Sequence, residues 1–341
     1  MTTASTTDTE AHRLIELPDA PAIPGLSFRS VELEADAAGI AAVINESAVA
    51  DGQEFQLSPE DVRHDLEHQA NFDLGRDVLI AEIDGRIVGE AEQNVVVRDG
   101  VAVHQWNAWV HPEHRGRGIG RAVVRWVERR ARQAAAEWPG SEPHELGTWM
   151  DSEFAAGRKI LESEGYREVR YGFSMIRPLS EHIPDTELPD GLEVRAVVAA
   201  DHRRIWDADC EAFRDHNDAA TRTEEDFERW FTMPNIDTSL WRVAWDGDEV
   251  VGSVMTFIWP EENEKLGLNR GWLEHISVRR PWRKRGVAKA LIADSLRMLR
   301  DMGIAEGMLG VDAKNPNGAL QLYESLGFRQ HRTGVSFRKS I

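Results

Sequence analysis

One short pattern of residues suited to binding phosphate occurs twice in this chain. It reads Val-His-Pro-Glu-His-Arg-Gly-Arg-Gly-Ile-Gly at residues 110–120 and Val-Arg-Arg-Pro-Trp-Arg-Lys-Arg-Gly-Val-Ala at residues 278–288. An apolar, strand-like run comes before each copy, and a long helix-like run follows it. A strand that turns sharply into a helix directs unpaired backbone N–H groups and the positive end of the helix dipole at one point, where phosphate oxygens bind. Each copy therefore predicts a phosphate-binding loop.

Two other kinds of phosphate-binding motif do not match these residues. Neither copy has the Gly-Lys-Ser/Thr ending with which a P-loop reaches the terminal phosphates and magnesium. A dinucleotide-binding fingerprint needs a third glycine or alanine where the first copy has Val123. Two glycines at the end of a strand often form nothing more than a turn. Here, however, the same valine, basic residue and small residues recur in both copies, which favours a functional loop.

Composition narrows the class of protein. The chain has 341 residues, 41% of them apolar, which suits about two domains. Its 59 acidic and 40 basic residues give a net charge of −19, which argues against a nucleic-acid partner and favours a cationic small molecule. An acidic surface can equally serve solubility alone. Cys210 is the only cysteine, so no intramolecular disulfide can form, and a cytoplasmic location is expected. We expect no membrane partner, because no apolar run is long enough to span a bilayer.

The repeat extends well beyond the two loops. Each half has an early strand signal, a capped helix start, an Asp-Gly hairpin signal and a helix-ending glycine followed by an aromatic residue. The matching pairs are Gly25–Arg29 with Gly191–Arg195, Ser58 with Thr223, Asp84-Gly85 with Asp246-Gly247, and Gly165-Tyr166 with Gly327-Phe328. After the loops, residues 121–138 and 289–302 are expected to be helices. The chain is therefore an internal duplication.

The duplication predicts an α+β (mixed α/β) fold with two domains in tandem. We expect a disordered tail over residues 1–20, an N-terminal domain over 21–177 and a C-terminal domain over 191–341. Residues 178–190, which carry Pro184 and Pro189 among acidic residues, are expected to be a linker.

The order of elements around the loops Arg115-x-x-Gly118-x-Gly120 and Arg283-x-x-Gly286-x-Ala288 resembles the GNAT superfamily of N-acetyltransferases. The resemblance covers nearly the whole chain, and the tandem layout is similar to that of proteins related to mycothiol synthase. It implies two GNAT folds, each with a central twisted mixed sheet flanked by helices. It also implies acetyl-CoA as the acyl donor, with no metal.

In this family the loop holds the pyrophosphate of acetyl-CoA, and the strand before it pairs with the pantetheine arm. The residues that the resemblance assigns to acetyl-CoA in the second half are Ile276, Ser277, Val278, Arg283, Lys284, Arg285, Gly286, Val287, Ala288, Lys289 and Asn315. Those in the first half are Ala108, Trp109, Val110, Arg115, Gly116, Arg117, Gly118, Ile119, Gly120 and Arg121. Because the chain is acidic, the anionic cofactor needs a locally positive mouth, expected from Arg279, Arg280, Arg283, Lys284 and Arg285.

The two halves differ at the position of the family's general acid. Acyl transfer from a thioester leaves a thiolate that needs a proton or a hydrogen bond. Tyr323 stands four residues before Gly327, where the family keeps a tyrosine for this purpose. In the first half Leu161 stands four residues before Gly165 and has no proton to give. The resemblance therefore assigns the general acid to the second half alone.

The position of the base differs in the same way. Glu274 lies on the strand before the second loop, where several family members keep a carboxylate that takes the proton of the amine. Trp106, 168 residues earlier, cannot act as a base. Strict strand alternation would place Glu274 with Ile276 and Val278 on one face. His275, expected on the other face, is a second candidate for moving the proton.

We therefore expect a monomeric or homodimeric N-acetyltransferase whose second half acetylates a primary amine of a small cationic molecule. The backbone N–H of Val278 is expected to polarise the thioester carbonyl. The first half is expected to be non-catalytic, although it keeps its loop. The alternative is a non-catalytic binding protein that responds to acetyl-CoA. His64 and His68 stand four apart on an expected helix, but no third ligand accompanies them, so an exposed helical face is expected instead of a metal site.

Overall fold

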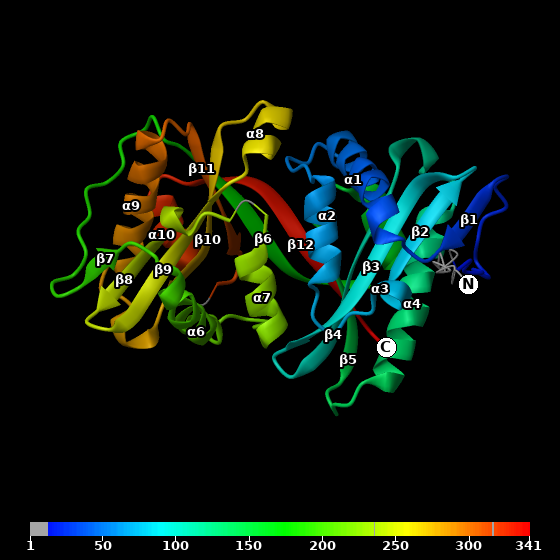
Figure 1. Ribbon diagram of the computed structural model, residues 1–341, viewed down its shortest axis with the longest axis horizontal. Helices are drawn as coiled ribbons and strands as arrows, with labels where there is room; N and C mark the ends of the chain where they lie inside the picture. The colour runs from blue at the N-terminus through cyan, green and yellow to red at the C-terminus, as the bar shows by residue number, and fades with distance from the viewer. Residues whose placement is uncertain (1–12, 235, 316) are drawn as a thin grey trace, which may run out of the picture.

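The computed structural model describes residues 13–234, 236–315 and 317–341. Within them, twelve strands form one mixed sheet in the order β1-β2-β3-β4-β5-β12-β6-β11-β10-β9-β8-β7 (Figure 1). The strands are β1 (Leu26–Arg29), β2 (Val78–Ile83), β3 (Arg86–Arg98), β4 (Val101–Val110), β5 (His144–Asp151), β6 (Arg167–Pro178), β7 (Glu193–Arg195), β8 (Arg242–Asp246), β9 (Glu249–Ile258), β10 (Arg270–Val278), β11 (Glu306–Asp312) and β12 (Arg329–Ser340).

Helices cover both faces of the sheet in each half of the chain. They are α1 (Leu33–Ala50), α2 (Pro59–Glu67), α3 (Leu74–Asp77), α4 (Ile119–Glu137), α5 (Ala155–Ser163), α6 (His202–Phe213), α7 (Glu224–Thr232), α8 (Pro260–Leu266), α9 (Val287–Asp301) and α10 (Ala319–Ser325). In the first half α4 and α5 pack on one face, and α1 and α2 on the other. In the second half α9 and α10 take the first role, and α6 and α7 the second. The expected α+β class is confirmed.

Local sequence signals set the ends of several elements as expected. Ser58 and Thr223 each form a capping box at the start of α2 and α7, with the third helical residue bonding back. Gly165 and Gly327 have positive φ values of 87° and 89° just after α5 and α10. The long helices α4 and α9 begin two residues earlier than expected, because a left-handed glycine at the N-cap already starts each of them.

The last strand of each half belongs to the sheet of the other half. β6, from the first half, pairs with β11 of the second, and β12, from the second half, pairs with β5 of the first. The two exchanged strands also pair with each other across the middle of the molecule (Figure 1). Val335 and Phe337 of β12 are buried in the core beneath α4, while Met175 of β6 is buried in the core beneath α9. Each hydrophobic core therefore needs residues from both halves.

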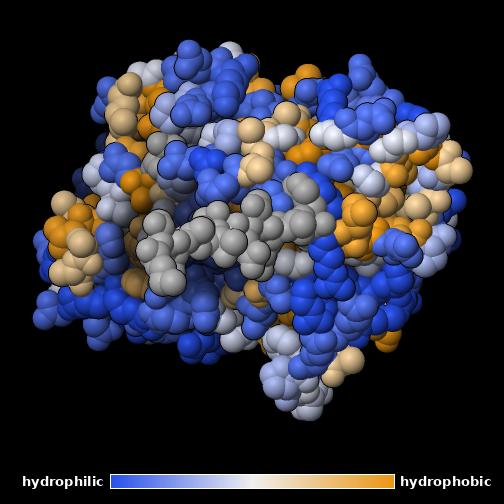
Figure 2. All heavy atoms as spheres, turned by 45° about the vertical axis from the view of Figure 1, so that its right-hand side comes forward, coloured by the Kyte–Doolittle hydropathy of each residue, from blue (hydrophilic) through white to orange (hydrophobic). Residues whose placement is uncertain are grey.

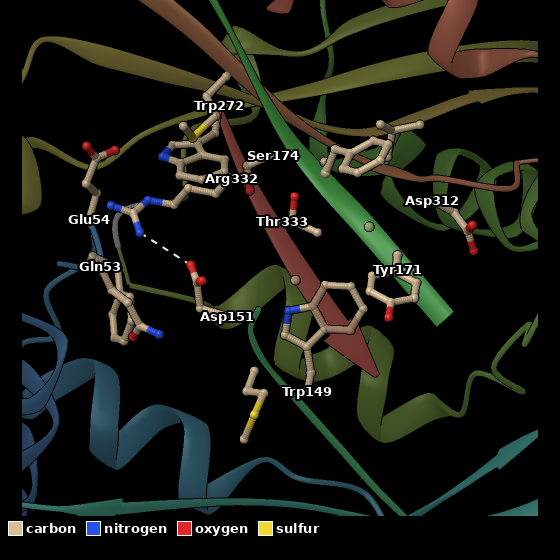
Figure 3. Close-up of a pocket in the computed structure, with 18 of the residues that line it drawn as sticks. Gln53, Glu54, Trp149, Asp151, Tyr171, Ser174, Trp272, Asp312, Arg332 and Thr333 are labelled. Carbon is tan, nitrogen blue, oxygen red and sulfur yellow. Dashed lines mark hydrogen bonds and ion pairs between the residues drawn. The ribbon is translucent and has the colours of Figure 1, made fainter. Parts of the chain in front are cut away.

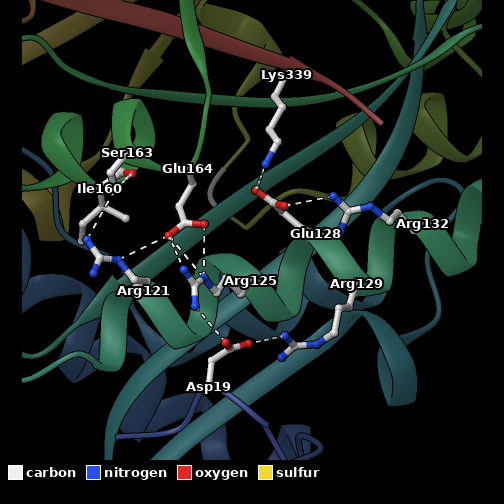
Figure 4. A network of polar contacts seen from close by, with 10 residues as sticks. All are labelled: Asp19, Arg121, Arg125, Glu128, Arg129, Arg132, Ile160, Ser163, Glu164 and Lys339. Carbon is white, nitrogen blue, oxygen red and sulfur yellow. Dashed lines mark hydrogen bonds and ion pairs between the residues drawn. The ribbon is translucent and has the colours of Figure 1, made fainter.

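Part of the segment expected to be a disordered tail packs on the first half, at residues 17 and 19. Leu17 is buried in the first core. Asp19 forms ion pairs with Arg125 at 2.8 Å and Arg129 at 2.6 Å on α4 (Figure 4). Residues 1–12 lie outside the described part of the chain. The two ion pairs hold the segment along α4, because one carboxylate binds two arginines on the same face of the helix.

The stretch expected to be a linker also contributes to a core. Leu179 and Ile183 are buried and pack in the cluster beneath α9. The molecular surface shown in Figure 2 is mostly hydrophilic, in keeping with the acidic composition. Among the helices in the described ranges, none is long and apolar enough to cross a membrane.

Candidate active site

Each half has two parallel neighbouring strands that separate along their length. β4 pairs with β5 only from Ala102 to Gln105, and β10 pairs with β11 only from Arg270 to Trp272. Beyond these points no pairing joins the two strands in either half of the described chain. The facing edges of β4 and β10 therefore leave backbone groups that an extended ligand can pair with, as an added strand would.

The two glycine loops lie at the end of these strands and have the same backbone. A short 3-10 turn follows each strand, at Pro112–His114 and Arg280–Trp282. Two left-handed residues come next, with φ values of 72° and 98° at Gly116 and Gly118, and 58° and 92° at Lys284 and Gly286. Gly118 and Gly286 are then the N-caps of α4 and α9 and have no side-chain cap. The first N–H groups of both helices therefore have no side-chain cap, which is the backbone arrangement that an anion-binding loop needs.

Several arginines expected near the pyrophosphate are engaged within the fold. Arg115 donates to the carbonyl of Val110 at 3.0 Å and pairs with Asp51 at 2.6 Å. Arg283 repeats both contacts, with the carbonyl of Val278 at 2.8 Å and with Asp215 at 2.6 Å. These side chains fix the loop to the strand and to the preceding helix.

Other basic residues of the expected positive mouth are also paired. Arg279 contacts Glu211 at 2.9 Å, and Arg280 bonds Asp215, whose pKa these hydrogen bonds hold well below its usual range. Arg121 in the first half pairs with Glu164 at 3.3 Å (Figure 4). Lys284 and Arg285 are exposed and have no ion pair among the described residues. Positive charge at the second loop therefore comes from these two residues and from the helix N-terminus.

A cavity of about 540 Å³ fills the gap between the separating strands of the first half. Most of the first-half residues assigned to acetyl-CoA line it. They are Ala108, Trp109, Val110, Arg115, Gly116, Gly118, Gly120 and Arg121. The opposite wall comes from β5 and α5, and includes Leu161. The shape and the lining fit a long ligand whose anionic end lies at the loop.

In the second half the structure brings Glu274 and Tyr323 close together. Tyr323 lies on α10, is only 6% exposed, and packs in the core cluster beneath α9. Burial raises the pKa of Glu274, and burial together with the negative charge of Glu274 raises the pKa of Tyr323. The corresponding residues of the first half, Trp106 and Leu161, are both buried in its core. Of these two matching pairs of positions, only the pair in the second half holds a carboxylate and a phenol.

A β-bulge interrupts β10 next to Glu274. The register of β10 with β9 shifts between Glu274 and Ser277, and His275 has a left-handed φ of 44°. Leu273 and Ile276 pack in the same cluster, although strict alternation would put them on opposite faces. The expected alternation is therefore wrong here, because the bulge adds a residue to one face. In the first half, β3 and β4 pair without a register shift.

A second cavity, of about 590 Å³, lies between the two halves (Figure 3). The strand exchange builds it, since its walls include β5, β6, β11 and β12. Trp149 and Tyr171 are 44% and 40% exposed at this cavity. Asp151 lies 3.3 Å from Arg332, and Glu54 lies 2.9 Å from Arg270.

Two glycines on neighbouring strands make room for an aromatic ring in this cavity. A Cβ at Gly172 or at Gly334 would meet the ring of Trp149, so both glycines leave room for that ring. The cavity also shares Gln53, Asn107, Trp109, Trp149 and Met150 with the cavity of the first half. Sequence analysis did not find this site, because its residues come from strands whose pairing is not encoded locally.

The histidines considered as metal ligands have other roles. His64 is buried instead of exposed, and its Nε2 lies 3.2 Å from the hydroxyl of Thr232 on α7. Among the described residues, the group that could hold an ion is His111 with Glu113 and His114. Nη2 of Arg86 lies 3.2 Å from Nε2 of His111, and a second cation there would be repelled.

Comparison with known proteins agrees with this geometry. Residues 202–328 match the model of the acetyltransferase (GNAT) family, and residues 75–168 match that of an acetyltransferase (GNAT) domain. A mycothiol acetyltransferase of Geodermatophilus obscurus is 28% identical over 311 residues, which cover 89% of this chain and 96% of that protein. One from Salinispora arenicola is 32% identical over 234 residues, covering 68% and 71%. A GCN5-related N-acetyltransferase from Sphaerobacter thermophilus superposes with a TM-score of 0.70 at 30% identity, covering 95% and 97%.

Proposed function

The chain belongs to the acetyltransferase (GNAT) family as an N-acetyltransferase with two GNAT domains, and from this premise we propose that its second half transfers an acetyl group from acetyl-CoA directly to a primary amine of a small cationic molecule. The observation that carries the proposal is that Glu274, on the strand with the open edge, lies near the buried Tyr323, whose pKa is raised by burial and by the negative charge of Glu274. The first half has an open edge and a loop of the same kind, but Trp106 and Leu161 replace the two proton-handling residues.

The residues of the second half divide the reaction between them. Glu274 takes a proton from the ammonium form of the acceptor, so that the free amine can attack the thioester carbonyl. A backbone N–H on the open edge of β10, for which we propose that of Val278, stabilises the negative charge that develops on the carbonyl oxygen. Tyr323 gives a hydrogen bond or its proton to the thiolate that leaves. The transfer is direct, and no acyl-enzyme forms.

The environment of the two residues suits these roles. Burial raises the pKa of Glu274 toward the working range, which makes its carboxylate a better base than an exposed one. The raised pKa of Tyr323 keeps the phenol protonated at neutral pH, as a hydrogen-bond donor must be.

We propose that the acceptor binds in the cavity between the halves. Exposed faces of Trp149 and Tyr171 offer stacking surface, and Asp151 and Asp312 offer carboxylates for hydroxyl and ammonium groups. Such a lining suits a polar, cationic amine that carries hydroxyl groups, and the mycothiol acetyltransferase relatives support an acceptor of the mycothiol class. The acidic composition of the chain favours the same cationic class.

We propose a non-catalytic role for the first half. Its cavity holds acetyl-CoA without turnover, and its ligand forms part of the wall of the acceptor cavity. The shared residues Trp109, Trp149 and Asn107 support this arrangement, because they line both spaces.

Matched substitutions in the two loops test the proposal. Gly286→Glu and Gly118→Glu each place an acid at a left-handed N-cap, with φ values of 92° and 98°, so both carry similar backbone strain. Thiol release from acetyl-CoA should be followed with a panel of amines, and acetyl-CoA binding by calorimetry. Gly286→Glu should abolish turnover, while Gly118→Glu should remove one binding event and keep turnover.

The opposite pattern, with turnover lost only in Gly118→Glu, would assign catalysis to the first half and refute the proposal. Binding of acetyl-CoA with no thiol release on any amine of the panel would favour the alternative of a non-catalytic protein that responds to acetyl-CoA.

A further inference from the structure

We propose that Asp209 and His275 form a positioning pair that fixes the bulge of β10 and, with it, the place of Glu274. The inference rests on the proposed function, in which Glu274 is the base. Asp209 lies on α6, and His275 is the left-handed residue of the bulge.

The pair is joined by a short hydrogen bond to a buried carboxylate. Nδ1 of His275 donates to Oδ2 of Asp209 at 2.8 Å, and Arg222 donates to the same oxygen at 2.8 Å. Asp209 is 1% exposed, and its other oxygen, Oδ1, is buried with no hydrogen-bond partner among the described residues. Burying a carboxylate oxygen without a hydrogen bond lowers the stability of the folded protein. An unsatisfied buried group of this kind therefore calls for a functional explanation.

Hydrogen bonding to Asp209 orients the imidazole. Because a carboxylate oxygen accepts, Nδ1 carries the proton of this bond, and Nη2 of Arg222 lies 3.3 Å from the same nitrogen. The pKa of Asp209, which burial alone would raise, is lowered by His275 and Arg222, so it stays ionised.

The other neighbours of the imidazole are mostly apolar. The rings of Trp230 and Phe213 pack against it with centroids at 4.3 Å and 5.3 Å. The charged and titratable groups around it are Asp209 from α6, Arg222 from the segment before α7, Glu274 from β10, and His216, whose ring lies tilted against Phe213 with centroids at 4.4 Å.

The first half of the chain supplies an internal comparison. Asp209 stands six residues before Asp215, and Asn45 stands six residues before the matching Asp51. In the same way, Asn107 stands where the second half has His275, three residues before the valine that the loop arginine contacts.

The two asparagines of the first half do not reproduce the pair. Asn45 bonds both backbone groups of Leu57, at 2.8 Å and 2.9 Å, and Asn107 bonds Glu92 at 3.1 Å. The strand of Asn107 has no bulge. The half that has lost the acid and the base has therefore also lost the Asp–His pair and the bulge, so four positions differ together.

His275 opposes the effect of burial on the pKa of Glu274. Burial raises that pKa, and the electrostatic influence of His275 lowers it. Without His275 the carboxylate would hold its proton to higher pH, and the base would be inactive over more of the acidic range. Asp209 acts on Glu274 through His275, since its hydrogen bond holds the ring in place.

Two substitutions that borrow the residues of the first half test the pair. Asparagine tolerates left-handed backbone, so His275→Asn removes the imidazole but keeps the conformation that the bulge needs. Asp209→Asn removes the charge but keeps the shape. Each should lower kcat by about tenfold or more and move the acidic limb of the kcat/KM profile to higher pH. KM for acetyl-CoA should stay within about twofold, because neither residue lies at the loop.

His202→Asn is the matched control. His202 lies on α6 like Asp209 and stacks on Phe231 at 4.3 Å, but it has no contact with the bulge among those described. This variant should keep the wild-type kcat and pH profile. Thermal unfolding of all variants, followed by circular dichroism, verifies that they fold, and His275→Asn decides the question if Asp209→Asn does not.

The outcomes separate this inference from the proposed function. An unshifted acidic limb in His275→Asn, whether kcat falls or not, overturns the inference, because a merely structural residue would leave the limb in place. If wild-type protein acetylates an amine and Glu274→Gln does not, the proposed function stands even when the inference fails. If wild-type protein shows no acetyl transfer, the proposed function itself is refuted.

Discussion

Tyr323→Phe isolates one hydroxyl group at the proposed active site. The structure gives this hydroxyl no hydrogen bond to any described residue, and the ring keeps its edge contact with Phe328 at 6.2 Å. Removing the oxygen should therefore change the free energy of unfolding by less than about 1 kcal/mol. The loss of a general acid should lower kcat by about 10²-fold to 10³-fold, or about 3 to 4 kcal/mol of activation free energy.

The assay measures thiol release at saturating amine, with acetyl-CoA varied, alongside urea unfolding. KM for acetyl-CoA should stay within about threefold, because the phenol acts on the leaving group and not on the bound thioester. Tyr166 is a suitable control, since it is also buried and its hydroxyl has no hydrogen-bond partner in the described chain. Tyr166→Phe should keep kcat. A kcat for Tyr323→Phe within about threefold of wild type would remove the tyrosine from the mechanism.

Two further predictions concern residues outside the reacting centre. Burial lowers the pKa of His104 from 6.5 to about 4, so below pH 6.5 the unfolded chain binds more protons than the folded chain, and the free energy of unfolding decreases as the pH is lowered. In urea titrations, wild-type protein should lose about 2 kcal/mol more unfolding free energy than His104→Gln between pH 7.5 and pH 5. Equal losses in the two proteins would contradict the assignment. Arg177→Met should lower the free energy of unfolding by about 2 to 4 kcal/mol, because this buried side chain donates to the carbonyls of Leu326 at 2.6 Å and His182 at 2.8 Å. It should also lower kcat, because Leu326 ends the helix that carries Tyr323. Unchanged urea unfolding and kcat would show that the contact is dispensable.

Features that depend on residues close together in the sequence could be predicted from the sequence alone. Ser58 and Thr223 mark helix starts because the cap and its partner lie three residues apart. The loops at Gly118 and Gly286 could be predicted because glycine spacing fixes their left-handed backbone. Tyr323 was found through its distance to Gly327, a spacing within one short helix.

Features that depend on distant partners could not be predicted in this way. Arg283 was expected to face a phosphate, but its partner Asp215 lies 68 residues earlier in the chain, so the ion pair leaves no local signal. The bulge at His275 follows from the register with β9 and from Asp209 on α6, neither of which strand alternation reveals. The cavity between the halves could not be predicted, because it depends on the exchange of β6 and β12.

The exchange of β6 and β12 bears on how this protein came to have two unequal halves. Each half gives its last strand to the sheet of the other, the exchange that a domain-swapped dimer makes between two chains. Fusion in one chain makes that partner permanent. One half can then diverge without becoming dispensable, since β6 still completes the sheet that carries Glu274 and supplies Met175 to the core in which Tyr323 packs. Shared folding thus gives the first half a role that does not depend on catalysis.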